Sequence, residues 1–320
     1  NLLYNVVDRI YIGYIPEHAT LSLTGLGVCL PVITAVMAFA NLFGMGGAPL
    51  CSIERGRGNQ KEAEAIMGNA FTLMVICGIL LTILGIVFRR PLLYLFGASD
   101  STYPYAESYM TIYLLGSVFV MMGLGMNAFI NSQGFGRIGM QTVLLGAVAN
   151  IILDPVFIFG FRMDVRGAAL ATIISQFLSA AWVLRFLFSD RSILRLKRET
   201  MMLKKARVLK IVSMGMSSFA AGFTNSVVAV ACNATLQTWG GDLYVGVMTV
   251  IHSVREIAEN LVKGLTGGSQ PVLGYNFGAG QYDRVKKAIR FLSVSTIAFT
   301  TFCWILISIF PETFIHIFNR

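Results

Sequence analysis

The sequence predicts an all-α protein whose helices cross a membrane several times. Of its 320 residues, 55% are hydrophobic and only 13% are charged, whereas a soluble domain carries roughly 25% charged residues. Long stretches such as 65–88 and 211–241 contain no charged residue at all, and a helix needs about 20 apolar residues to cross a bilayer. These observations indicate a polytopic membrane bundle rather than a soluble domain.

Nine helices are expected from the apolar stretches and from the connections between them, at 1–15, 21–52, 65–88, 105–133, 139–161, 167–188, 210–238, 243–274 and 288–310. The basic residues gather in alternate connections, 17 on one predicted side and 4 on the other. This bias places the amino end and the basic connections in the cytoplasm. The net charge of +9 therefore reflects membrane topology, and we expect no binding to nucleic acid.

The strongest basic run, "SDRSILRLKRETMMLKKARVLK", lies between two predicted spans. We expect residues 189–209 to form a basic cytoplasmic linker whose charge fixes the topology, with binding to a partner or to lipid as the alternative. It separates a first transmembrane lobe, residues 1–188, from the start of a second lobe, residues 210–320.

An internal repeat supports this division. Shifting the chain by 222 residues aligns four landmarks of the first lobe with four of the second: Gly46, Pro49, Gly56 and Gly58 with Gly268, Pro271, Gly278 and Gly280. Both copies cross the membrane in the same direction, as parallel repeats do. The first repeat holds six predicted helices and the second holds three, so we expect the chain to be a fragment that lacks the last helices of its second six-helix repeat.

One apolar helix carries a carboxylate near its centre, in the stretch "AVANIILDPVFIFG". A charge at this depth costs about 2.5–3.5 kcal/mol, so Asp154 should face a cavity or a partner. Asn150 lies one helical turn earlier on the same face, and Pro155 leaves the carbonyl of Ile151 without its usual helical donor. Hard cations such as Na⁺ prefer this set of oxygen ligands.

Two further residues have a similar predicted depth. Asp154 lies eight residues before Arg162 at the outer boundary, and Asp8 lies eight residues before Pro16, which places both roughly 12 Å deep. Thr172 in the next helix lies roughly 9 Å deep by the same measure. Three oxygen-bearing side chains could then meet in the outer half of the first lobe. Equal depth leaves two alternatives open: the hydroxyl of Thr172 can bond back to its own helix, and Arg9 can neutralise Asp8.

A second polar cluster lies in the predicted helix 243–274. Arg255, Glu259 and Lys263 follow one another at i, i+4 spacing, and Glu256 lies beside them. Two interpretations stay open: a ladder of ion pairs within the helix, or a polar wall of a central cavity that faces cationic solutes. Asn127 is a weaker candidate for the same cavity, because lone amides often serve helix packing.

No enzyme motif is present in the sequence. It contains no H-E-x-x-H, no G-x-S-x-G and no P-loop. The five cysteines lie within predicted spans without paired spacing, so we expect them to pack as small apolar residues. We therefore expect a transporter rather than an enzyme, with no cofactor.

Together these motifs resemble the multidrug and toxic compound extrusion (MATE) family. The resemblance rests on Asp8 in the first helix, "GMGGAPLCSIERGRGNQKEAEAIMGNA", "NIILDPVFIFG", "GAALAT" and the second-lobe segment "QPVLGYNFGAGQYDRVKKA". It implies two six-helix lobes around a central cavity, and a first-lobe cation site at Asp8, Asn150, Asp154 and Thr172. Some branches of the family place an acidic residue in the seventh helix, which this chain lacks.

The resemblance implies a monomeric antiporter, coupled to H⁺ or Na⁺, that exports small organic cations across the bacterial plasma membrane. The alternative is a lipid-linked oligosaccharide flippase of the same superfamily. A flippase cavity needs arginines for pyrophosphate, and apart from Arg185 and Arg290 at span ends only Arg9 and Arg255 lie within predicted spans.

Overall fold

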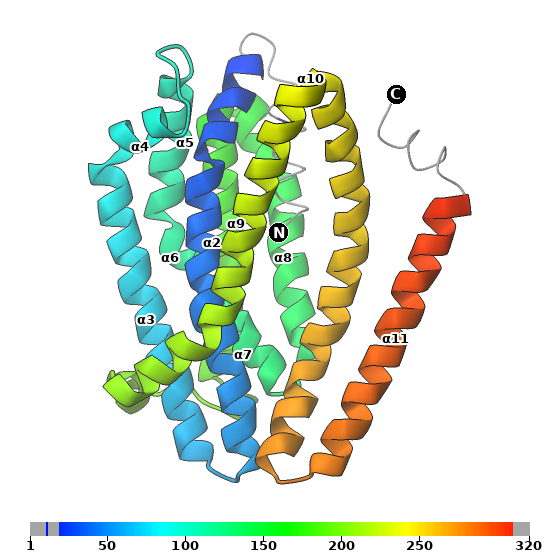
Figure 1. Cartoon of the computed structure of the whole chain (residues 1–320). Helices are drawn as coiled ribbons and strands as arrows, with labels where there is room; N and C mark the ends of the chain where they lie inside the picture. The colour runs from blue at the N-terminus through cyan, green and yellow to red at the C-terminus, as the bar shows by residue number, and fades with distance from the viewer. Residues whose placement is uncertain (1–10, 12–18, 310–320) are drawn as a thin grey trace. The chain divides into compact units, whose positions relative to one another are not determined.

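The structure is a computed structural model, which describes the backbone of residue 11 and of residues 19–309. These residues form helices and contain no strand (Figure 1), which confirms the predicted all-α class. Five of the described helices are long and apolar enough to cross a membrane, or six if one bent pair counts as a single span. The predicted first helix, 1–15, lies outside the described residues apart from Tyr11.

The chain forms two units, one of residues 1–51 with 59–219 and one of residues 52–58 with 220–320. In the first unit the predicted helices 21–52, 65–88, 139–161 and 167–188 are found as α2 (Ala19–Gly56), α3 (Gln60–Val87), α8 (Gly136–Pro155) and α9 (Asp164–Phe188). A short helix that the apolar pattern did not predict, α4 (Arg89–Leu95), follows α3.

The predicted helix 105–133 is broken rather than continuous. It consists of α5 (Tyr103–Leu115), α6 (Ser117–Met121), the π-helical turn η1 (Met122–Met126) and α7 (Asn127–Ser132), and its axis bends by 59° at Gly116. A side chain at Gly116 would collide with Ile173 of α9. The bend therefore occurs where glycine lets a neighbouring helix approach closely.

The second unit contains most of α10 (Lys205–Gly278) and α11 (Tyr282–Ile309). Two predicted helices, 210–238 and 243–274, are joined in α10 without a helical break. The ribbon of α10 nevertheless reverses its direction at its yellow section (Figure 1), so it still provides two antiparallel arms.

Within the second unit, a pair of glycines brings the last turn of α2 into backbone contact with the end of α10. A Cβ atom on Gly56 would meet the carbonyl oxygen of Tyr275, and one on Gly278 would meet the carbonyl oxygen of Ile53. Because Ile53 and Tyr275 are also separated by the 222-residue offset, this contact is symmetric with respect to the repeat. The same offset pairs Gly58 with Gly280, which have φ values of 77° and 72°.

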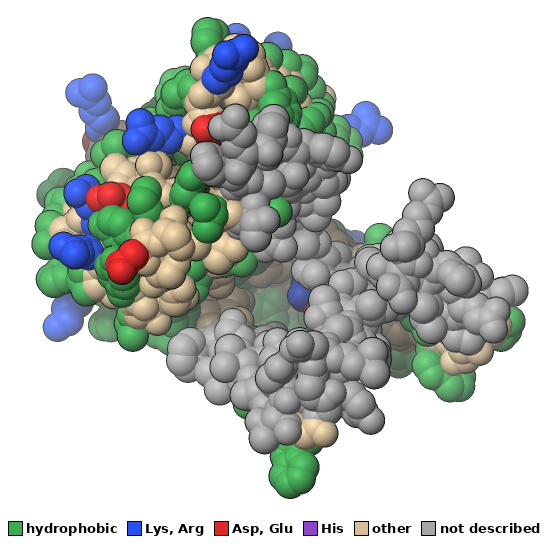
Figure 2. Space-filling view, turned by 90° about the horizontal axis from the view of Figure 1, so that it is seen from above, with side chains coloured by type: hydrophobic (Ala, Val, Ile, Leu, Met, Phe, Trp, Pro, Cys, Tyr) green, Lys and Arg blue, Asp and Glu red, His purple; other side chains and the backbone are tan. Residues whose placement is uncertain are grey.

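A methionine-rich core fills the first unit. Its largest fully buried side chains include Met67, Met74, Met110, Met121 and Met126. Many large hydrophobic side chains of the described residues are exposed, among them Leu80, Leu84 and Val87 of α3, and hydrophobic side chains are prominent in the view of Figure 2, beside several charged ones. This distribution is the one expected of helices whose outer faces contact lipid.

Candidate functional site

The two sides of α8 differ in polarity and in burial. Its exposed side is apolar and includes Met140, Leu144, Val148 and Ile152. Its buried side carries small and polar residues, namely Gly139, Thr142, Gly146, Ala147, Asn150 and Asp154. The carboxylate of α8 is therefore directed into the first unit and away from the surface that lipid would cover.

Asn150 and Asp154 form a buried hydrogen-bonded pair. The amide Nδ2 of Asn150 donates to Oδ1 of Asp154 over 3.1 Å, and both residues are 0% exposed. This contact realises the predicted i, i+4 spacing on one helix face. A buried carboxylate needs such donors, because it has lost its water shell.

The helix changes its winding directly after Asp154. Pro155 ends α8, and the π-helical turn η2 (Val156–Gly160) follows, closed by the bond from the N–H of Phe161 to the carbonyl of Val156 over 2.9 Å. Proline supplies no N–H, so the regular ladder cannot continue through it. Wide turns of this kind are frequent at functional sites, and this one follows the buried pair immediately.

Helix α9 lies antiparallel to α8 in a register that two contacts fix. Ser179 Oγ donates to the carbonyl of Thr142 over 3.2 Å, and a side chain at Gly167 would lie 2.8 Å from the backbone of Phe157. Thr172 lies between these two contacts along α9, and the matching position along α8 is at the level of Asn150. Thr172 is 6% exposed, and it lies two helical turns from Ser179 on the same face of α9.

The same face of α9 carries two polar residues that were not predicted as part of the site. Ser175 and Gln176 are 0% and 7% exposed, and with Thr172 and Ser179 they follow the spacing i, i+3, i+4, i+7 that defines one side of a helix. This period is present in the sequence and could have revealed the polar stripe. Each residue by itself, however, is common in the packing of membrane helices.

The first helix can be placed only through Tyr11. The ring of Tyr11 packs edge-on against that of Phe159 in η2, with 6.3 Å between the centroids. This contact brings the described part of the first helix next to the turn that follows Asp154. Asp8, three residues before Tyr11 in the sequence, lies outside the described residues.

The charges of the predicted helix 243–274 form a ladder of ion pairs. Glu259 accepts from Nε of Arg255 over 2.9 Å and from Nζ of Lys263 over 3.2 Å. These side chains are 41%, 60% and 66% exposed, respectively. These contacts match the ladder of ion pairs within the helix, one of the two interpretations of this cluster. The side chain of Glu256 lies outside the described residues.

Asn127 makes a packing contact between two elements. Its Nδ2 donates to the carbonyl of Gly139 over 3.2 Å, which joins the start of α7 to the first turn of α8. This contact holds the broken helix against α8, so packing explains the residue without a cavity.

The chemistry that the buried site can offer is oxygen ligation. It presents a carboxylate, an amide and hydroxyl groups on two adjacent helices, and the described residues bring no three His, Cys, Asp or Glu side chains together. Oxygen sets of this kind suit a hard monovalent cation or a proton on the carboxylate. They do not suit a soft transition metal.

Comparisons with known proteins show that this chain is similar to multidrug exporters. The family model described as MatE matches residues 1–156. The multidrug export protein MepA of Staphylococcus haemolyticus is 24% identical over 319 residues, which cover 100% of this chain and 70% of MepA. MepA of Staphylococcus aureus strain N315 is 23% identical over 96% of this chain and 67% of its own length.

Solved structures extend the match to three dimensions. The MATE multidrug transporter DinF-BH is 31% identical with a TM-score of 0.85, over 99% of this chain and 71% of that one. A MATE protein solved in complex with MaD3S has a TM-score of 0.93 at 22% identity, over 99% of this chain and 71% of that one. At this identity the match is evidence for the fold and not for the function. The chain thus belongs to the multidrug and toxic compound extrusion (MATE) family of membrane transporters.

Proposed function

We propose that this protein is a multidrug efflux antiporter of the plasma membrane, which exports organic cations by alternating access in exchange for H⁺ or Na⁺. The family supports export, since MepA and DinF-BH are described as multidrug transporters. The observation that supports the coupling is the buried Asn150–Asp154 pair, because a fully buried carboxylate in a membrane helix is costly and such residues mark ion or substrate pathways.

In this mechanism Asp154 holds the coupling cation on its carboxylate. A proton would neutralise the carboxylate, whereas Na⁺ would be bound by the carboxylate with the amide oxygen of Asn150 and the hydroxyl of Thr172. Asp8 would complete the site from the first helix. Either cation removes the cost of a bare buried charge, so the arrangement of α8 and its neighbours that is stable with the cation differs from the one stable without it.

Substrate and cation would then stabilise opposite conformations of the first lobe. A bound cation favours the conformation that releases the drug outside. Loss of the cation to the cytoplasm returns the lobe to the opposite conformation. A substrate can shift this equilibrium only by its differential affinity for the two states. Cationic substrates fit this scheme, because the ionised carboxylate attracts them and the neutralised one does not.

The test measures ethidium efflux from cells that express Asp154→Asn, and ethidium uptake into everted vesicles prepared from these cells. Asparagine keeps the shape and the hydrogen bond to Asn150 but cannot be ionised, so we expect efflux to fall to the level of cells without the protein. The experiment is repeated with the proton gradient and the sodium gradient collapsed separately, which identifies the ion. Ethidium efflux that Asp154→Asn leaves intact would remove this carboxylate from the mechanism.

A matched control is Asp164→Asn. Asp164 is an exposed aspartate at the start of α9 with a φ of 48°, a backbone conformation that asparagine adopts readily. This variant makes the same chemical change outside the buried site, so it should retain the efflux of the parent protein. A flippase would export no ethidium in the parent protein, and collapsing the proton gradient or the sodium gradient would therefore change nothing.

A further inference from the structure

The connection between α9 and the first turns of α10, residues 189–210, is packed against the first unit. We call it the strap; it includes the short 3₁₀ helix η3 (Arg198–Met201). In its first part, Ser192, Leu194 and Leu196 are buried while the residues between them are exposed. This alternation is that of an extended chain with one face against a surface. A freely moving linker would not bury every second side chain.

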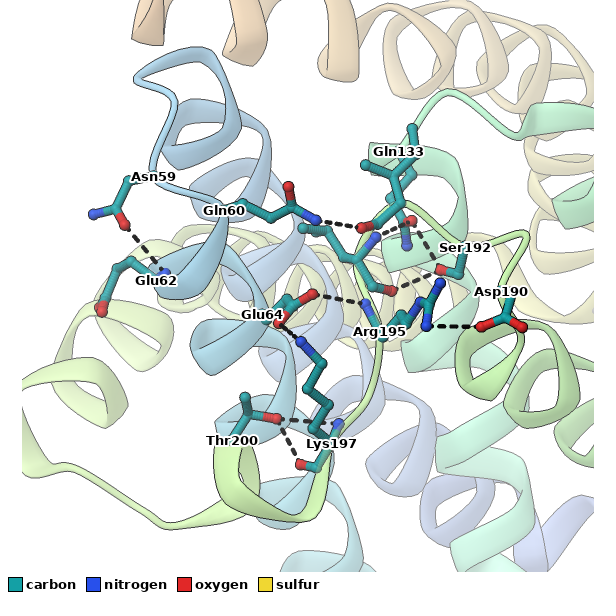
Figure 3. Close-up of polar contacts among 12 residues, drawn as sticks. Asn59, Gln60, Glu62, Glu64, Gln133, Asp190, Ser192, Arg195, Lys197 and Thr200 are labelled. Carbon is teal, nitrogen blue, oxygen red and sulfur yellow. Dashed lines mark hydrogen bonds and ion pairs between the residues drawn. The ribbon is translucent and has the colours of Figure 1, made fainter.

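Polar side chains on neighbouring elements hold this extended part (Figure 3). Gln133, just after α7, accepts at Oε1 from the backbone N–H of Leu194 over 2.8 Å and from the hydroxyl of Ser192 over 2.9 Å. Gln60, at the start of α3, donates from Nε2 to the carbonyl of Ile193 over 2.7 Å. These backbone groups of the strap are therefore satisfied by fixed partners.

The second part of the strap runs along α3. Lys197 donates to the buried carboxylate of Glu64 over 2.7 Å, and Asn69 Nδ2 donates to the carbonyls of Thr200 and Met202 over 3.1 and 2.9 Å. A side chain at Gly68 would collide with the carbonyl oxygen of Thr200. The glycine lets the strap approach α3 at backbone distance.

Its basic residues fall into two groups. Three form ion pairs at the surface of the first unit: Arg195 with Asp190 at 2.7 Å, Lys197 with Glu64 at 2.7 Å and Arg207 with Glu62 at 2.6 Å. The other five are exposed and form no ion pair with the described carboxylates, namely Arg191, Arg198, Lys204, Lys205 and Lys210. The pairs of Lys197 with Glu64 and of Arg207 with Glu62 fasten the strap to α3, whereas the pair of Arg195 with Asp190 lies within the strap. The second group leaves an exposed array of positive charge.

Large apolar side chains are exposed beside these charges. Met202 is 76% exposed, Leu203 is 43% exposed and Leu209 is 59% exposed. Met202 lies next to Asn69, about two helical turns before Ile76, where the exposed apolar side of α3 begins. The strap thus lies beside the end of α3 at which its exposed apolar side stops, where the headgroups of a surrounding bilayer would meet the hydrocarbon.

We propose that the strap is a binding surface for anionic phospholipid headgroups of the inner leaflet. The exposed cations complement the phosphates, while Met202, Leu203 and Leu209 enter the upper part of the acyl region. Each cation near such a surface strengthens binding about fivefold, and the hydrogen bonds of the strap already hold the backbone that carries these cations. The inference depends on the geometry of the strap and not on the coupling ion or the transported substrate.

The test uses the purified, delipidated full chain in detergent, titrated with phosphatidylglycerol or with phosphatidylcholine, and follows the thermal unfolding midpoint. We expect phosphatidylglycerol to raise the midpoint at far lower concentration than phosphatidylcholine. In Arg198→Gln/Lys204→Gln/Lys205→Gln the apparent affinity for phosphatidylglycerol should fall about a hundredfold, since each lost cation costs about fivefold.

Two variants separate this surface from the general excess of positive charge. Lys286→Gln/Lys287→Gln/Arg290→Gln removes the same charge from exposed positions of α11 and should leave the affinity unchanged. Arg198→Lys/Lys204→Arg/Lys205→Arg keeps the charge and should also bind as the parent protein does, which shows that any loss comes from charge and not from misfolding.

Three outcomes would overturn the proposal. Equal losses in the strap variant and the α11 variant would show that total charge, and not the strap, attracts the lipid. An unchanged affinity in the strap variant would exclude the surface. A midpoint that inorganic phosphate raises as effectively as phosphatidylglycerol does would assign the cations to a soluble anion instead of a membrane.

Discussion

At the scale of single residues, the buried Asn150–Asp154 pair is the feature on which the proposed function depends. The sequence indicated both residues, because a carboxylate in an uncharged span is conspicuous and an amide one turn away shares its face. The structure shows the hydrogen bond between them and the complete burial of both. Their role in cation binding stays a prediction, as does that of Asp8 and Thr172.

Replacing the donor of this pair should weaken coupling without unfolding the protein. In Asn150→Ala, Asp154 loses a hydrogen bond to a charged group, which contributes about 1.5 kcal/mol or more, so we expect the rate of ethidium efflux to fall roughly tenfold. Gln141→Ala is the matched control, because it removes an exposed amide from the same helix. Equal rates for the two variants would show that the amide of Asn150 has no part in transport.

Other residues of the candidate site were harder to recognise from the sequence. Ser175 and Gln176 are buried on the face of α9 that carries Thr172, but serine and glutamine in a membrane helix are often only packing residues. The period of this polar stripe is present in the sequence, but its position beside α8 becomes visible only when the register of the two helices is known. That register depends on close contacts such as Gly167 with Phe157, which no local pattern specifies.

At the scale of elements, the apolar pattern predicted where helices occur but not where they break. Uncharged stretches made α2, α3, α8 and α9 predictable, since length and hydropathy suffice for a membrane helix. The bend at Gly116 and the π-helical turn η1 depend on how neighbouring helices fit, for example on Ile173 against Gly116. The strap is a similar case: its charge was predicted, whereas its packing depends on distant partners such as Gln133 and Glu64.

The symmetric glycine contact between α2 and α10 leads to a prediction about stability. In Gly278→Ala the new methyl group would meet the carbonyl oxygen of Ile53, so the two backbones must separate. Crowding of this kind typically costs about 1–3 kcal/mol, and we expect the thermal unfolding midpoint in detergent to fall by several degrees.

The matched control for this prediction is Gly264→Ala, in the same helix. A side chain at Gly264 has open space around it, and alanine favours a helix over glycine by about 0.5–1 kcal/mol. This variant should therefore keep or slightly raise the unfolding midpoint. If both variants unfold at the temperature of the parent protein, the backbone contact at Gly278 does not stabilise the fold.

At the scale of the whole molecule, the repeat and the motifs were sufficient to predict the family from the sequence. The offset of 222 residues aligns glycines and a proline, and the structure gives these positions a physical meaning. Gly58 and Gly280 both adopt positive φ, and Gly56 and Gly278 both contact a backbone carbonyl. Such landmarks are predictable because few residues other than glycine tolerate them. The predicted lobe boundaries, the orientation in the membrane and the oligomeric state stay predictions.

The central claim is that Asp154 holds a cation that leaves when substrate binds. It is tested most directly by adding ethidium to the purified protein in weakly buffered detergent solution, and measuring the protons released and the bound ²²Na⁺ displaced. The parent protein should release one of the two ions on binding ethidium, and Asp154→Asn should release neither. Release of the same ion in the same amount from Asp154→Asn would contradict the claim.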